Sequence, residues 1–186
     1  REMIMATVNK PDLRLTYKEY VLFPDDGNRH EIINGDHYMT SAPSTYHQTV
    51  SKRLQFELYT KIELAGHGQV FNAPIDVQFS PYDVVQPDLV AMYANTRAKI
   101  TPAKIIGPPD IVVEIMSPST ASNDLELKRR LYERNGVGEY WIVDPHDNSI
   151  RRLVLQDGVY VDQPVETNEL RLVGLPEVTI CLASIW

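Results

Sequence analysis

The stretch that decides the fold is residues 110–116, which read Asp-Ile-Val-Val-Glu-Ile-Met. The continuous apolar run Ile111-Val112-Val113 is typical of a strand that is buried on both faces of a sheet. Glu114 stands inside this strand, and a buried carboxylate is costly unless a cation pairs with it or binds it. The stretch therefore predicts a central strand that carries a functional or ion-paired acid.

A second acid has the same kind of surroundings. Residues 84–90 read Val-Val-Gln-Pro-Asp-Leu-Val, so Asp88 also lies within an apolar strand. Two buried acids on central strands need a partner, and a divalent metal is an economical one because Mg²⁺ accepts one or two carboxylates. The alternatives are two separate ion pairs or two solvent-exposed strand ends, and sequence spacing alone does not decide between them.

Lys128 is the third candidate. The spacing predicts a helix over residues 123–135, closed by Gly136. At about 100° per residue, Lys128 falls inside the apolar arc that Leu131 and Tyr132 share. An inward-pointing lysine would meet a carboxylate or a phosphate, whereas the alternative is a lysine whose stem covers apolar surface.

The remaining elements frame these three residues. Thr16 and Glu19 form a capping box for a short helix, and Asn34-Gly35 predicts the turn of a hairpin over residues 30–39. Apolar residues spaced by four predict a long helix over residues 44–64. Further strands are expected over residues 69–79, 84–93, 139–144, 150–155 and 178–182. This order predicts a single α/β (α+β) domain, residues 7–186, around one mixed sheet.

Composition excludes several classes of protein. The 186 residues include 18 Lys and Arg against 25 Asp and Glu, a net charge of −7, which argues against a chain coated all over with nucleic acid. The single cysteine excludes an internal disulfide and a cysteine-rich zinc site. Residues 1–5 lack an apolar signal region, and no apolar run is long enough for a membrane span, so a cytoplasmic protein without membrane contact is expected.

Two segments are specific enough to carry a resemblance: Glu-Ile-Met-Ser-Pro-Ser-Thr at 114–120 and Glu-Tyr-Trp-Ile-Val-Asp at 139–144. With them, the chain resembles the PD-(D/E)XK nucleases and, more closely, the bacterial Uma2 family of restriction-endonuclease-like proteins. The other resembling stretches are residues 16–20, 31–36, 73–77, 85–89, 109–113, 128–132 and 138–145.

The resemblance implies a restriction-endonuclease-like core, a central mixed sheet flanked by helices. It assigns Asp88 and Glu114 to the acidic positions of the motif. Met116 stands where the motif has its lysine, and Lys128 from the following helix takes that role. Asp88, Glu114 and the carbonyl of Ile115 are then expected to hold Mg²⁺ or Mn²⁺. Replacing Lys128 by methionine is expected to abolish cleavage and leave folding intact.

Three other polar residues are open to two interpretations. Glu31 either completes the catalytic set, as an early acid does in the wider fold, or is a hairpin acid that pairs with Arg29 or with Lys52 of the long helix. His47 either touches substrate or caps the long helix. Asp76 is either a further polar group near the site or an acid at a strand end.

The implied activity is Mg²⁺-dependent endonucleolytic hydrolysis of nucleic acid, with DNA as the expected substrate. Residues 89–109 contain no acid, and their basic residues could be solvated by chance or could meet phosphate. The expected phosphate contacts are Arg97, Lys99, Lys104, Arg129, Arg130 and Arg134.

Two other functions remain open: a catalytically silent module that binds nucleic acid or a protein, and a metal-dependent hydrolase with another substrate. A homodimer or larger homo-oligomer is expected because aromatic residues are enriched at interfaces. The candidate interface aromatics are Tyr38, Tyr46, Tyr59, Tyr160 and Trp186.

Overall fold

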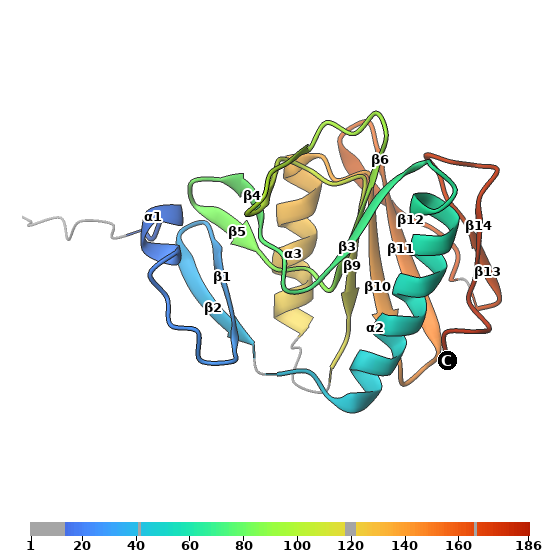
Figure 1. Cartoon of the computed structure of the whole chain (residues 1–186), viewed down its shortest axis with the longest axis horizontal. Coiled ribbons are helices and arrows are strands. Elements are labelled where there is room, and N and C mark those ends of the chain that lie inside the picture. The colour runs from blue at the N-terminus through green and yellow to red at the C-terminus, as the bar shows by residue number, and fades with distance from the viewer. Residues whose placement is uncertain (1–13, 41, 118–121, 166) are drawn as a thin grey trace, which may run out of the picture.

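Two six-stranded sheets form the framework of the described chain (Figure 1). The computed structural model describes residues 14–40, 42–117, 122–165 and 167–186. Residues 7–13 of the expected domain and residues 118–120 of the resembling stretch lie outside this description. The architecture is a mixed α+β fold, as predicted, with two sheets in place of the single one expected, and the more central of them is a mixed sheet flanked by helices.

The first sheet has the strand order β2-β1-β5-β4-β8-β7. Its strands are β1 Arg29–Ile33, β2 Asp36–Thr40, β4 Val77–Ser80, β5 Asp83–Val85, β7 Lys99–Ile100 and β8 Ile105–Ile106. The hairpin expected at Asn34-Gly35 is present, because β1 and β2 pair in an antiparallel register from Arg29↔Thr40 to Ile33↔Asp36.

The second sheet has the order β12-β11-β10-β9-β6-β3, with β9 and β10 parallel. Its strands are β3 Gly68–Asn72, β6 Leu89–Tyr93, β9 Ile111–Ile115, β10 Glu139–Asp144, β11 Ser149–Gln156 and β12 Val159–Asp162. A two-stranded ribbon, β13 Glu169–Arg171 with β14 Thr179–Cys181, follows. All five residues of β9 are buried, as its apolar run predicts.

Helices cover both faces of the second sheet (Figure 1). The helix α2, Thr45–Leu58, continues through a π-helical turn, Tyr59–Glu63, and buries its apolar stripe against one face. The helix α3, Ser122–Asn135, packs between the other face and the first sheet. The short helix α1, Tyr17–Tyr20, begins at the expected capping box of Thr16 and Glu19. No described helix is long and apolar enough to cross a bilayer.

Two strands that the sequence predicts as continuous are each divided between the two sheets. The segment 69–79 becomes β3 and β4, with Pro74 at the crossing, and the segment 84–93 becomes β5 and β6, with Pro87 at the crossing. Proline lacks the backbone N–H that a sheet ladder needs, so each proline marks the place where the chain leaves one sheet for the other. The crossings lie side by side, since the Ala73 amide donates to the Asp88 carbonyl at 3.0 Å.

One smaller expectation is also corrected. Tyr160 is not an exposed aromatic: it is buried, and its hydroxyl donates to the Val137 carbonyl at 3.0 Å. Tyr46 and Tyr59 are exposed, as expected.

Candidate active site

Asp88 directly precedes β6, rather than lying within a strand as predicted, and Glu114 lies on the neighbouring strand β9. The antiparallel register of β6 and β9 pairs Leu89 with Val113, and extending it one residue beyond the start of β6 brings Asp88 across from Glu114. The Asp88 carboxylate accepts from the Ile115 amide of β9 at 2.8 Å, which fixes it beside Glu114. Side chains at opposite positions project to the same face of a sheet, with Cβ atoms about 4.5–5.5 Å apart. The expectation that the two acid-bearing strands are adjacent, with the helix after them packed on that face, is confirmed.

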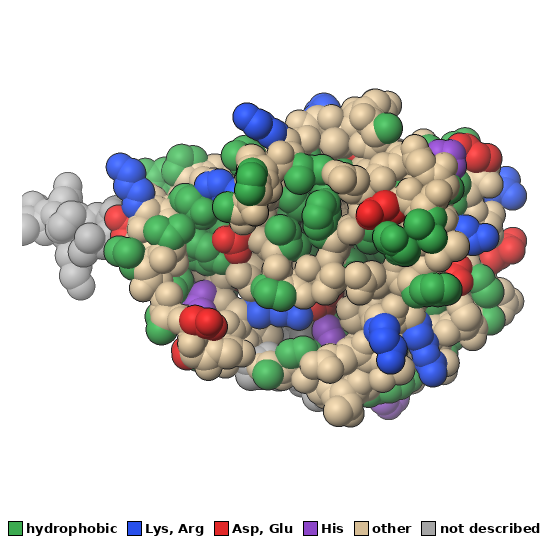
Figure 2. Space-filling model, in the orientation of Figure 1, with side chains coloured by type: hydrophobic (Ala, Val, Ile, Leu, Met, Phe, Trp, Pro, Cys, Tyr) green, Lys and Arg blue, Asp and Glu red, His purple; other side chains and the backbone are tan. Residues whose placement is uncertain are grey.

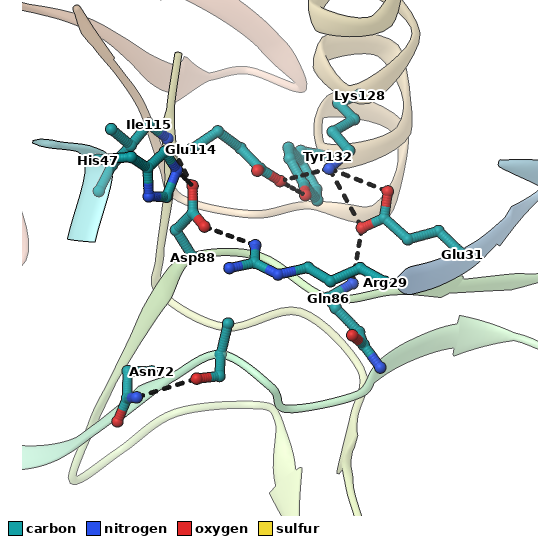
Figure 3. A network of polar contacts seen from close by, with 11 residues as sticks. Arg29, Glu31, His47, Asn72, Gln86, Asp88, Glu114, Ile115, Lys128 and Tyr132 are labelled. Carbon is teal, nitrogen blue, oxygen red and sulfur yellow. Dashed lines mark hydrogen bonds and ion pairs between the residues drawn. The ribbon is translucent and has the colours of Figure 1, made fainter. Parts of the chain in front are cut away.

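Lys128 joins two acids that come from different sheets. Its Nζ lies 3.0 Å from Oε1 of Glu114 and 3.0 Å from Oε2 of Glu31 (Figure 3). All three side chains are buried, and Glu31 also accepts from the Gln86 amide at 2.7 Å. The inward direction that the helical wheel predicts for Lys128 is confirmed. Glu31 contacts Lys128 at the site, rather than forming the hairpin pair with Arg29 or Lys52.

Asp88 has partners on three sides (Figure 3). Its Oδ1 accepts from Nη1 of Arg29 at 2.5 Å, and its Oδ2 lies 3.1 Å from Nε2 of His47 and accepts from the Ile115 amide at 2.8 Å. His47 is 7% exposed, and its backbone N–H donates to the N-cap Ser44. The buried Asp88 carboxylate is therefore neutralised by Arg29 and held in place by α2 and β9.

The surroundings push the pKa values of the two acids apart. Burial raises the pKa of Glu114 from 4.5 to about 7, with further raising by Asp88 and Glu31, against the opposing effects of Lys128 and Tyr132. Burial also opposes ionisation of Asp88, but His47, Arg29 and the Ile115 amide together outweigh it and lower its pKa. Carboxyl pairs with divergent pKa values are a common feature of acid–base catalytic sites.

The donor chemistry fits a hard cation such as Mg²⁺. Carboxylate and carbonyl oxygens are available from Asp88, Glu114 and Ile115, and no group of three or more His, Cys, Asp or Glu side chains in the described ranges forms a metal cage. Mg²⁺ suits such a site because it uses one or two carboxylates and completes its shell with waters and phosphate oxygens. A cation beside Asp88 has to displace at least one of its contacts with Arg29 and His47.

A cleft of about 250 Å³ opens onto Asp88. It lies between the β1–β2 hairpin and the first turns of α2, where Figure 2 shows a hollow with basic and histidine side chains at its floor. Asp88, Arg29 and His47 line the cleft, and Lys52 lies on its wall. Phosphate could therefore approach Asp88 past two cations. The other lining residues are Pro43, Gln48, Ser51, Gln55, Asn72 and Ala73.

Three of the six cations expected to contact phosphate lie on α3 and pair within the protein. Arg129 and Arg130 pair with Glu126 at 3.6 and 3.0 Å, and Arg134 pairs with Asp83 at 2.8 Å. None of the three arginines lines the cleft at Asp88.

The other three of the six cations lie past the C-terminal end of α3 or at the far edge of the first sheet. Arg97 donates to the Gly136 carbonyl at 2.9 Å, which is about 12 Å along the helix from Lys128 at about 1.5 Å per residue. Lys99 and Lys104 belong to the β7–β8 hairpin at the far edge of the first sheet. A phosphate contact by any of the six remains a prediction.

Asp76 lies near the site without contacting the other two carboxylates. Its Oδ1 accepts from the Tyr20 hydroxyl at 2.7 Å and from Nε2 of Gln86 at 2.9 Å. The backbone N–H of Gln86 donates to Glu31, so Asp76 is linked to the site through Gln86. This agrees with the interpretation of Asp76 as a further polar group near the site.

Sequence reasoning missed two residues of the site, Arg29 and Tyr132. Arg29 and Glu31 are two residues apart on β1 and therefore share a face, which the period of a strand could have revealed. Tyr132 follows Lys128 by four residues, one helical turn, and its hydroxyl donates to Oε1 of Glu114 at 2.6 Å. Both signals become useful only once the partner residue is recognised as part of the site.

Comparisons with known proteins identify a family and a fold for this chain. A family model described as "Uma2: Putative restriction endonuclease" matches residues 17–183. An uncharacterized protein of Synechocystis sp. (strain ATCC 27184 / PCC 6803 / Kazusa) is 27% identical over 135 residues, which are 72% of this chain and 70% of that protein.

A solved structure shares the fold. The crystal structure of "a putative nuclease belonging to DUF820" from Anabaena variabilis ATCC 29413 has a TM-score of 0.73 at 15% identity, covering 92% of this chain and 97% of that chain. The family match extends over nearly the whole described chain and includes Glu31, Asp88, Glu114 and Lys128. The chain therefore belongs to the Uma2 family of restriction-endonuclease-like proteins.

Proposed function

We propose that this protein is a metal-dependent endonuclease that hydrolyses phosphodiester bonds of nucleic acid, with DNA as substrate and Mg²⁺ or Mn²⁺ as cofactor. The observation that carries the proposal is the bond of the Asp88 carboxylate to the Ile115 amide, next to Glu114 on β9, with Lys128 at 3.0 Å from Glu114. The family description and the description of the Anabaena structure both support a nuclease.

Asp88, Glu114 and the carbonyl of Ile115 are the residues proposed to hold the metal. A metal bound there supplies a polarised phosphoryl oxygen and a water of lowered pKa. Lys128 is placed to orient the attacking water or to offset the negative charge that develops on phosphate. Glu31 acts on Lys128, because its carboxylate fixes the ammonium at 3.0 Å and keeps it beside Glu114.

Arg29 is proposed to contact the phosphate. Its side chain is 23% exposed, lies in the cleft and pairs with Asp88 in the structure described here. A guanidinium binds phosphate well because its N–H groups form a planar fork. When another cation neutralises Asp88, Arg29 is free to turn toward a phosphate oxygen in the same cleft.

Cleavage assays on plasmid, single-stranded DNA, branched DNA and RNA, with Mg²⁺, Mn²⁺ or EDTA, test the proposal. The wild type is expected to cleave only with metal, whereas Asp88→Asn and Glu114→Gln are expected to be inactive while keeping a folded circular dichroism spectrum. Glu169→Gln, on the exposed edge of β13, is the matched control and is expected to cleave normally. Metal-independent cleavage, or none on any substrate, contradicts the proposal.

A second candidate is a nuclease-fold module that binds nucleic acid or a protein without turnover. The specific observation in its favour is that Arg29 and His47 already satisfy the Asp88 carboxylate without a metal. Binding of nucleic acid without cleavage, in the same panel of substrates and metals, would support this candidate.

The homodimer expected from the sequence is also proposed, and a monomeric mass in light scattering would contradict it.

A further inference from the structure

A pocket of about 530 Å³ lies beside the candidate active site. Met116 and Ser117 follow β9, Pro145 follows β10, and Tyr46 and His47 come from the first turn of α2. It lies at the carboxyl ends of two parallel strands, which is where ligands commonly bind open α/β sheets. We call this cavity the Tyr46 pocket.

The walls of the Tyr46 pocket suit a flat ring with polar groups at its edge. The Tyr46 side chain is 48% exposed, and its hydroxyl donates to the Pro145 carbonyl at 3.1 Å, which holds the ring at the pocket. Met116 and Pro145 add apolar surface, while the polar groups at the wall are Ser44, Ser117, His146 and the carboxylate of Asp144. Planar ligands with polar edges are bound by this combination of an aromatic ring and a few polar groups.

The charges of the two neighbouring cavities differ. No lysine or arginine is among the described residues that line the Tyr46 pocket, and Asp144 adds an acid, whereas the cleft at Asp88 contains Arg29 and Lys52. The cleft therefore suits phosphate, and the Tyr46 pocket does not. His47 lines both cavities and lies 3.1 Å from Asp88, so a phosphate at Asp88 and a group in the pocket would be separated by one side chain.

We propose that the Tyr46 pocket binds one unpaired base of the nucleic acid, next to the phosphate that lies at Asp88. This inference rests on the proposed function and deepens it. Bases of a duplex are stacked and paired, so only a single strand, a flap, a bulge or a flipped-out nucleotide can place a base in a side pocket. The substrate class is therefore nucleic acid with an unpaired nucleotide at the point of cleavage.

Binding in the Glu114→Gln background, which separates binding from cleavage, tests the pocket. Fluorescence anisotropy with labelled oligonucleotides in Mg²⁺ compares a single strand, a duplex with one bulged nucleotide, and a blunt duplex. Tyr46→Ala is expected to weaken binding of the single strand and of the bulge by about 10-fold, the size of one base–aromatic stacking contact, and to leave the duplex unchanged. Tyr46→Phe keeps the ring but loses the bond to the Pro145 carbonyl, so it should weaken binding less than Tyr46→Ala does.

Tyr59→Ala is the matched control, because Tyr59 is 39% exposed on the continuation of the same helix but does not line the pocket. In a second measurement, an oligonucleotide with one 5-iodouracil is photo-crosslinked to the chain with Tyr46 intact. Mass spectrometry should find the crosslink on the peptide that contains Tyr46 or Met116. This result does not depend on whether Tyr46→Ala folds.

Two results would overturn the proposal, and they differ in what else they overturn. Equal loss of affinity for all three oligonucleotides in Tyr46→Ala, or crosslinks elsewhere, would contradict the base pocket. Metal-dependent cleavage by the wild type would still support the proposed nuclease function in that case. If the wild type neither binds nor cleaves any nucleic acid, both the pocket and the proposed function are wrong.

Discussion

The ammonium of Lys128 lies 3.0 Å from the carboxylate of Glu114, although 14 residues separate them and they come from a helix and a strand. The same ammonium is 3.0 Å from Glu31, so one cation serves two buried acids. Because of this arrangement, the removal of Lys128 should lower the free energy of unfolding as well as abolish cleavage.

Replacing Lys128 by methionine is expected to abolish metal-dependent cleavage and to lower the free energy of unfolding by about 3–5 kcal/mol at pH 8, the usual cost of removing one partner of a buried ion pair. The sequence alone suggested that folding would be unaffected, because the contact with Glu31 was not foreseen. Urea unfolding and cleavage assays measure the two effects. Cleavage at the wild-type rate would show that Lys128 has no part in the reaction.

The double variant Lys128→Met with Met116→Lys tests whether the position of the charge matters. Met116 directly follows β9, two residues after Glu114, and packs against the cluster that contains Leu131 and Tyr132 of α3, so a lysine there lies on the same side of the sheet as Lys128. Part of the cleavage lost in Lys128→Met should return. The single Met116→Lys variant is the control, and no recovery in the double variant would show that Met116 cannot place the charge at the site.

Glu114→Gln is expected to flatten the pH dependence of stability between about pH 4.5 and pH 7. The pKa of Glu114 is about 7 in the fold against 4.5 as a free side chain, so in this window the folded state binds more protons than the unfolded state. The free energy of unfolding therefore falls as the pH rises through the window and changes no further above it. Urea unfolding from pH 4.5 to 8 measures the slope, and Glu169→Gln should leave it as in the wild type.

Arg29→Met is expected to bind Mn²⁺ at least about 10-fold more tightly than the wild type, while cleaving more slowly. The guanidinium lies 2.5 Å from Asp88 and competes with any cation for the same oxygen, and a tenfold change corresponds to about 1.4 kcal/mol. Calorimetry with Mn²⁺ measures the affinity directly. Lys52→Met, on the wall of the same cleft, is the matched control, and weaker binding in Arg29→Met would refute the competition.

Tyr132→Phe should lower the free energy of unfolding by about 1–3 kcal/mol at pH 8, because it removes the hydroxyl that donates to Glu114 at 2.6 Å. The pKa of Glu114 should rise further, since that hydrogen bond favours the ionised form. Urea unfolding and a titration followed by NMR measure the two quantities. Tyr59→Phe, on the exposed continuation of α2, should change neither.

Much of the site could be predicted because the sequence pattern within a single strand or helix was sufficient to indicate it. The apolar run around Glu114 identified a central strand, and the helical wheel predicted that Lys128 points inward. Burial of an acid was not sufficient by itself, however. Glu139 is also buried in an apolar strand, yet it bonds with Trp141 and lies near Arg152, away from the site.

The rest depended on contacts between elements, which local periodicity does not describe. Pro74 and Pro87 were visible in the sequence, but it did not show that each marks a change of sheet. Without that change, the hairpin that carries Arg29 and Glu31 has no reason to face Asp88 and Lys128. The long strands were therefore predicted as continuous, and Arg29 was not recognised as a partner of Asp88.

The side-by-side crossings at Ala73 and Asp88 have a consequence for how the chain acquires its structure. The second sheet holds Asp88 and Glu114, but the first sheet supplies Arg29, which neutralises Asp88, and Glu31, which fixes Lys128. Neither half can satisfy its buried charges alone, so a partly formed molecule with undocked sheets is penalised. The domain should fold cooperatively, and a shortened relative without the N-terminal hairpin should lose its fold together with its site.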